Sequence, residues 1–142
     1  ATWLIDRALE VLEDAELSKT MAPMILDLTE QIYSVAYENH SVMAECEKGV
    51  VLTTRIWWVQ CEAIIGFYNA YQKTNDQKYK TAAENIWQYI NEHLIDPRSG
   101  SEWYSEVDAD GLPTSKKPIV EPWKCPYHNG RMCLEIMKRY AQ

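Results

Sequence analysis

Residues 54–73 read TRIWWVQCEAIIGFYNAYQK and form the most apolar run of the chain. Apolar side chains recur there at helical spacing, and they occupy more than one face of the helix that this spacing predicts. A helix that is apolar on several faces packs against neighbours on both sides. We therefore expect residues 54–73 to form a central helix of an all-α domain.

The same periodicity extends to four other stretches of the sequence. They predict helices over residues 2–13, 18–38, 76–94 and 130–140. Short and long links alternate between the five predicted helices, which is typical of stacked helical hairpins. A length of 142 residues corresponds to one domain.

Two long connections separate the predicted helices. Residues 39–53 contain two short β-like runs, 42–44 and 50–52. Residues 96–126 contain five of the six prolines, and Asp110-Gly111 within them is a hairpin-turn signal. Connections of this length in a helical domain are usually functional or disordered. The Trp and Tyr side chains of the second connection argue against disorder.

The composition excludes several classes of function. The chain has 14 Lys+Arg against 21 Asp+Glu and a formal net charge of −7. An acidic chain without a basic run is a poor nucleic-acid binder, because phosphate contacts need clustered cations. The apolar runs are too short to cross a bilayer, which takes roughly 20 residues, so no membrane partner is expected. No signal-peptide pattern opens the chain, which predicts a cytoplasmic location and reduced cysteines.

The aromatic residues are unevenly distributed among their three types. Six Trp and nine Tyr stand against one Phe. Trp and Tyr are favoured where an aromatic face must also carry a polar tip. The excess of Trp and Tyr over Phe indicates an aromatic cleft that is open to water, and sugars are one class of ligand that stacks in such clefts. Trp123 lies in a proline-bounded loop five residues before His128, where core packing explains it less easily.

Two polar residues are candidates for chemistry. His128 lies where the proline-rich connection meets the start of the last predicted helix, and loops of this kind commonly hold catalytic groups. The alternative is a histidine that only fills space. Glu62 lies in the middle of the most apolar helix, on the same face as Trp58, and must be paired, hydrogen-bonded or protonated there. Either Arg55, seven residues earlier on nearly the same face, is its structural partner, or Glu62 lines a polar cavity.

Three segments together resemble one family, in order along the chain. They are Trp58-x-x-x-Glu62, the Ser101-Glu102-Trp103-Tyr104 stretch with its Asp110-Gly111 turn, and Lys124-Cys125-Pro126-Tyr127-His128-Asn129-Gly130-Arg131-Met132-Cys133. They resemble the C-terminal part of the cellobiose 2-epimerases, a branch of the N-acylglucosamine 2-epimerase superfamily. The resemblance covers residues 1–142. It implies the C-terminal part of a single (α/α)6-barrel catalytic domain, with about five of its twelve helices.

The resemblance also implies a reaction and a set of site residues. The reaction inverts C2 of the reducing-end glucose of cellobiose and related β-1,4 disaccharides, giving mannose, and needs no metal or other cofactor. One histidine removes the C2 proton, a cis-enediolate forms, and a second histidine returns a proton on the opposite face. The resemblance makes His128 one of these histidines and Glu62 a carboxylate that supports the catalytic groups. It places Trp3, Trp58 and Trp123 along the sugar cleft.

The start of the chain bears on its expected activity. Residues 1–5 are already periodic, so we expect the chain to be cut from a larger protein. In the family, the other catalytic histidine belongs to a Gly-His-Asp-x-Glu motif just before the position of Ala1. We therefore expect the chain alone to be inactive. Its expected partners are the disaccharide and the N-terminal remainder of the barrel, and the uncovered apolar faces are expected to favour self-association.

Two alternatives to this function stay open. The first is an N-acylglucosamine 2-epimerase or a mannose isomerase of the same superfamily, which would differ in the loops that face the non-reacting end of the sugar. The second is a non-catalytic helical module that binds sugar or another protein through its Trp-rich face.

Overall fold

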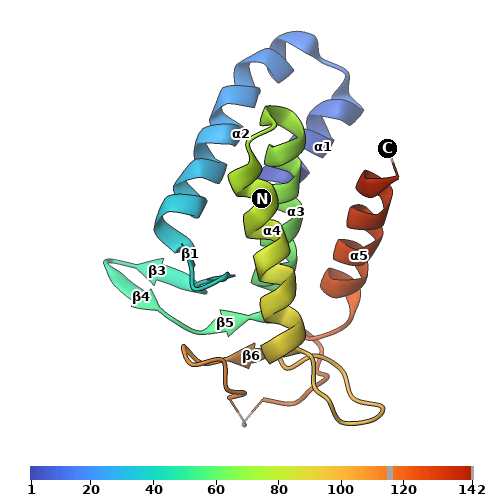
Figure 1. Ribbon diagram of the computed structural model, residues 1–142. Coiled ribbons are helices and arrows are strands. Elements are labelled where there is room, and N and C mark those ends of the chain that lie inside the picture. The colour runs from blue at the N-terminus through green and yellow to red at the C-terminus, as the bar shows by residue number, and fades with distance from the viewer. Residues whose placement is uncertain (115–116, 142) are drawn as a thin grey trace.

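The computed structural model describes residues 1–114 and 117–141 (Figure 1). Within these ranges the chain forms five α-helices, which confirms the all-α prediction. They are α1 (Thr2–Leu12), α2 (Ala15–Ala36), α3 (Trp57–Thr74), α4 (Gln77–Tyr89) and α5 (Tyr127–Tyr140). A π-helical turn, η1 (Ile90–Leu94), continues α4.

Helix α3 lies at the centre of the core, as its apolar faces predict. It contacts α1, α2, α4 and α5. In Figure 1, α3 and α4 occupy the middle, with α2 on one side and α5 on the other. Cys61 and Ile65 on α3 are completely buried, and they pack in one core with Ile86 of α4 and Met132 of α5. The four cysteines are all free.

The two long connections form short antiparallel strand pairs rather than open loops. The pairs are β1 (Tyr37–Glu38) with β2 (Ser41–Val42), β3 (Glu45–Glu47) with β4 (Val50–Leu52), and β5 (Arg55–Ile56) with β6 (Glu106–Val107). The predicted run 50–52 coincides with β4, whereas the run 42–44 overlaps β2 only at Val42. Strand β1 lies at the end of the predicted helix 18–38, and the pairing of β5 with β6 was not predicted.

The turn predicted at Asp110-Gly111 is confirmed. The carboxylate of Asp108 accepts hydrogen bonds from the backbone N–H groups of Asp110 at 3.0 Å and Leu112 at 2.9 Å. Gly111 has a φ of 79°, in the left-handed region that favours glycine. The turn therefore closes through local side-chain and backbone bonds, as this dipeptide indicates.

Three helices begin three residues away from their predicted starts. Helix α2 begins at Ala15 because Asp14 caps it, accepting a hydrogen bond from the Leu17 N–H at 2.9 Å. Helix α3 begins only at Trp57, since the two residues before it pair as strand β5. Helix α5 begins at Tyr127, three residues earlier than predicted. His128 therefore lies in the first turn of a helix and not in the preceding loop.

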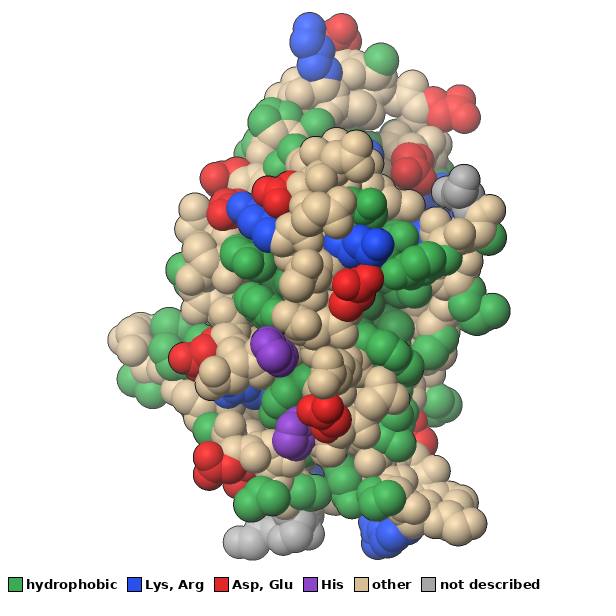
Figure 2. All heavy atoms as spheres, in the orientation of Figure 1, with side chains coloured by type: hydrophobic (Ala, Val, Ile, Leu, Met, Phe, Trp, Pro, Cys, Tyr) green, Lys and Arg blue, Asp and Glu red, His purple; other side chains and the backbone are tan. Residues whose placement is uncertain are grey.

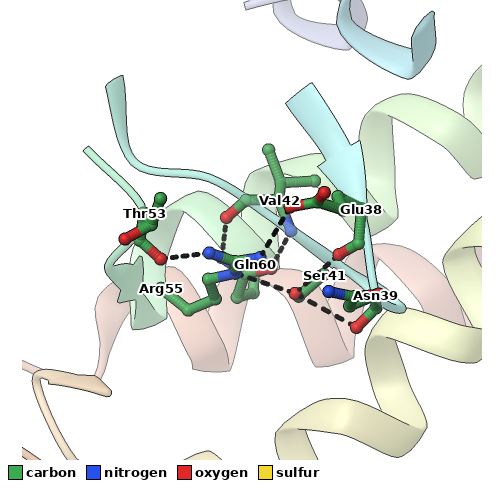
Figure 3. Close-up of polar contacts among 7 residues, drawn as sticks. All are labelled: Glu38, Asn39, Ser41, Val42, Thr53, Arg55 and Gln60. Carbon is green, nitrogen blue, oxygen red and sulfur yellow. Dashed lines mark hydrogen bonds and ion pairs between the residues drawn. The ribbon is translucent and has the colours of Figure 1, made fainter. Parts of the chain in front are cut away.

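Arg55 does not pair with Glu62, so this possible partnership is wrong. The Arg55 side chain is almost fully buried, and its Nε donates to Ser41 Oγ at 3.0 Å (Figure 3). Its Nη1 donates to the backbone carbonyl of Thr53, and its guanidinium lies 3.6 Å from the Glu38 carboxylate. Through these contacts Arg55 holds the first long connection against the start of α3.

Gln60 provides a second anchor for the same connection. Its side-chain amide accepts from the Val42 N–H at 2.8 Å and donates to the Val42 carbonyl at 2.7 Å (Figure 3). The side chain therefore pairs with β2 much as a neighbouring strand would.

Within residues 1–114 and 117–141, no helix is both long enough and apolar enough to span a membrane.

Candidate active site

Three helices meet at the carboxylate of Glu62. Its Oε2 accepts a hydrogen bond from the indole Nε1 of Trp3 on α1 at 2.9 Å. Its Oε1 lies 2.8 Å from Nδ1 of His128 and also accepts from Nη2 of Arg131, both on α5. Residues separated by about sixty positions in the sequence are therefore joined at one side chain of α3.

These contacts keep Glu62 ionised. Burial raises the pKa of Glu62, but hydrogen bonds from Arg131, His128 and Trp3 outweigh it and hold the pKa below its ordinary value. An ionised carboxylate is only an acceptor, so the contact assigns the proton of the neutral imidazole to Nδ1 of His128. Nε2 is then the nitrogen of His128 that can take up a proton.

Aromatic rings surround the imidazole of His128. Trp58 lies 5.6 Å away between ring centroids at a tilt of 32°, and Tyr127 lies 3.9 Å away. Trp57 packs edge-on at 6.3 Å. The His128 side chain is 14% exposed, so the ring is held by its neighbours but is not sealed from the surface.

A cavity of about 760 Å³ opens beside this cluster. Trp58 and Glu62 line it from α3, and Leu28, Ile32 and Val35 line it from α2. Trp58 is 41% exposed. Trp58 and Glu62 therefore lie at the edge of a space large enough for a sugar ring, but most of its lining is aliphatic and His128 is not part of that lining.

The other two predicted cleft residues lie in different environments. Trp3 is only 3% exposed, and its indole is occupied by the hydrogen bond to Glu62. Trp123 is 85% exposed, in the turn between Glu121 and Lys124. The structure thus brings Trp3, Trp58, Glu62 and His128 together, whereas no ring contact joins Trp123 to them among the described residues.

Arg131 is the site residue for which the sequence analysis assigned no role. It follows His128 by three positions, so the two side chains share one face of α5, and this spacing could have indicated a common site. Its guanidinium lies 5.4 Å from the Trp3 ring and 5.2 Å from the Tyr127 ring. Arg131 therefore brings both a charge and two aromatic contacts to Glu62.

The described ranges hold no group of three or more His, Cys, Asp or Glu side chains that could bind a metal ion. Glu62 holds the Nδ1 side of the His128 ring at 2.8 Å and so orients it. An imidazole oriented in this way can serve as a general acid or base.

Residues 2–129 match the family described as N-acylglucosamine 2-epimerase (GlcNAc 2-epimerase). The chain belongs to the N-acylglucosamine 2-epimerase family. It is 49% identical over 139 residues to a cellobiose 2-epimerase of Ruminococcus albus, covering 98% of this chain and 36% of that protein. A cellobiose 2-epimerase of Eubacterium cellulosolvens is 45% identical, with 97% and 34% covered.

Solved structures show the same likeness. The crystal structure of a sugar epimerase from a ruminal bacterium superposes with a TM-score of 0.95 at 48% identity, covering 97% of this chain and 36% of that one. The chain spans about a third of the length of the curated relatives that it matches. Its fold is therefore part of an (α/α)6 barrel, which confirms the predicted fold class.

Proposed function

We propose that the chain acts as the C-terminal part of an enzyme that inverts C2 of the reducing-end glucose of cellobiose and related β-1,4 disaccharides, giving mannose. The observation that carries the proposal is that Glu62 holds His128 beside the partly exposed side chain of Trp58. The similarity to proteins named cellobiose 2-epimerase, at 49% and 45% identity, supports the same substrate class.

The chemistry requires proton transfer on both faces of C2. In the ring-opened sugar, the C2–H bond lies next to the aldehyde, and its electrons can move into a C1–C2 double bond to give an enediolate. His128 transfers one proton through Nε2, and a group on the opposite face transfers the other. We propose that the second group comes from the N-terminal remainder of the barrel, and that the chain alone is inactive.

The remaining site residues have supporting roles in this proposal. Glu62 orients His128, while Trp3 and Arg131 keep Glu62 in place. Trp58 provides a wall on which the sugar ring stacks. Trp123 lines the sugar cleft from the loop over it. The same proposal includes a cytoplasmic location, where the disaccharide would be the partner.

The test is proton exchange at C2 in the full natural polypeptide that carries this chain. With cellobiose in heavy water, we expect an epimer that carries deuterium at C2. His128→Ala should lower deuterium incorporation by about a hundredfold or more, since a positioned acid or base contributes 10²–10⁴ to the rate. The control is His40→Asn, because His40 is exposed in the β1–β2 turn, where its φ of 62° suits asparagine.

Wild-type exchange in the His128→Ala protein would show that His128 is not the acid or base. The same assay with mannose and with an N-acylglucosamine measures the activities of the other two branches. Faster conversion of either sugar than of cellobiose would replace the proposed substrate. Sugar binding without exchange on any of the three would identify the non-catalytic binding module.

A further inference from the structure

A buried ion pair joins the second long connection to the start of α5. Lys124 is completely buried, and its ammonium group pairs with Oε2 of Glu102. The other oxygen of Glu102 accepts a hydrogen bond from Nδ2 of Asn129 at 2.6 Å. One carboxylate therefore holds a residue just before α5 and a residue in its first turn.

These contacts bracket His128 along the chain. Lys124 precedes His128 by four residues, and Asn129 follows it directly. The N-cap residue of α5 is Pro126, and no side chain caps this end of the helix. The first N–H groups of a helix have no partner within the helix, and no side-chain cap fixes this end of α5. Glu102 holds the same turn in another way, through the side-chain amide of Asn129.

The same lysine also lies over Trp57, one of the aromatic side chains around the His128 ring. Its Nζ lies 5.2 Å from the centroid of Trp57, and Trp57 packs edge-on against His128. Glu62 holds the imidazole from Nδ1 at 2.8 Å. The ring and the backbone of His128 are thus held by two separate carboxylates on different segments.

Stability alone is a weak explanation for a buried pair of this kind. Removing the Lys124 ammonium group from water costs free energy, the Glu102 side chain is still 25% exposed, and apolar replacements of buried ion pairs are often neutral or stabilising. The pair has a geometric consequence instead, because the buried cation orients the Glu102 carboxylate while its other oxygen binds Asn129.

We infer that Glu102, Lys124 and Asn129 are positioning residues that hold His128 in the orientation needed for proton transfer. The inference rests on the proposed function for the reaction, but the contacts themselves lie outside the Glu62 cluster. It predicts that the rate of the chemical step depends on three residues that do not touch the reacting carbon.

The test compares three variants of the full natural polypeptide. Asn129→Ala cuts the link to α5 and leaves the ion pair intact, whereas Lys124→Met removes the buried cation. Lys117→Met is the matched control, because Lys117 pairs with Glu106 at 2.8 Å in the same connection but is half exposed. We expect kcat for C2 exchange to fall roughly tenfold or more in the first two variants, since small displacements of a reacting group have large effects on rate. KM should change by less than about threefold, and the control should stay within about twofold of wild type.

A second measurement is independent of activity. Nitrogen-15 NMR of the histidine ring reports the tautomer of His128, and we expect its signals to shift or broaden in Asn129→Ala and Lys124→Met but not in Lys117→Met. A folded Asn129→Ala protein with wild-type kcat and unchanged His128 signals would overturn the inference, and so would a lower unfolding temperature as the only effect. If the wild type epimerises no sugar, the proposed function fails, and the NMR comparison still decides whether these residues position His128.

Discussion

Glu62 affects both the stability of the fold and the orientation of His128. A carboxylate inside the most apolar helix costs free energy unless donors compensate for the lost water. Trp3 on α1 and His128 and Arg131 on α5 provide these donors. Burial raises the pKa of Glu62 and the three donors lower it. The donors outweigh burial, so the pKa lies below its ordinary value of 4.5.

The first prediction concerns Arg131→Met. Because the folded-state pKa of Glu62 lies below its unfolded value, the ionised carboxylate stabilises the fold above the unfolded pKa, and this stabilisation is lost as pH falls through the folded pKa. Without Arg131 the folded pKa rises, so acid unfolding should move to higher pH. At neutral pH the free energy of unfolding should fall by about 2 kcal/mol, the contribution of a hydrogen bond to a charged group.

Denaturant unfolding, repeated from neutral pH into the acid range, measures both effects. Arg7→Met is the control, because Arg7 pairs with Glu10 at 2.7 Å on the exposed surface of α1. Exposed pairs contribute about 1 kcal/mol or less. An unchanged acid midpoint in Arg131→Met would show that Arg131 does not control the ionisation of Glu62.

At the scale of elements, the second long connection is shaped by its contact with η1. The turn at Gly111 packs against His93, whose ring lies 4.5 Å from that of Tyr89. A Cβ atom at position 111 would lie only 2.4 Å from His93 Nδ1. Glycine is therefore required here for space as well as for its left-handed backbone.

The second prediction uses two glycines with the same backbone and different surroundings. Gly111→Ala should destabilise the fold by about 3 kcal/mol, because a left-handed alanine costs about 1–2 kcal/mol and the His93 ring must also move away from Tyr89. Gly49→Ala should cost only about 1–2 kcal/mol, since Gly49 has a φ of 81° but no atom lies within 4 Å of its Cβ position. Thermal unfolding of both variants measures the difference, and equal losses would contradict the close contact with His93.

At the scale of the whole molecule, apolar side chains lie uncovered on two sides of the helical layers. Leu28, Ile32 and Val35 face the cavity beside α2 and are exposed. A second hollow of about 390 Å³ lies between α4 and α5, lined by apolar side chains that include Trp87 and Met137. Figure 2 shows hydrophobic side chains at the surface between these two helices. Exposed apolar surface of this extent favours association.

The third prediction is that the chain on its own self-associates through the α2 face. Burying one Leu, Ile or Val side chain contributes about 1.5–3 kcal/mol, so a charge placed there should oppose association. Ile32→Glu should shift the isolated 16.5 kDa chain toward the monomer in sedimentation velocity. Val11→Glu, an exposed position on α1 outside the cavity, is the control for added charge. A chain that is monomeric at every concentration would contradict this prediction.

Local patterns in the sequence were sufficient to predict that the five helices exist, but not where each begins. The periodicity of residues 54–73 predicted α3 and its central place, because side chains three and four positions apart share a face in any helix. The start of α5 was missed by three residues, since Tyr127, His128 and Asn129 do not continue the apolar period. The pairing of β5 with β6 was also missed, because its partners lie some fifty residues apart and neither two-residue strand has a pattern of its own.

The sequence alone identified Glu62 as a carboxylate that needed a partner and His128 as a candidate for catalysis. It could not select the partner: Arg55 was predicted on the helix of Glu62 but lies in β5 and binds the first connection, whereas Arg131, 69 residues away, binds Glu62. Helical periodicity is a local property that neighbouring residues determine. The partners of a buried charge depend on which helices pack together and at what rotation, and only the tertiary structure decides that.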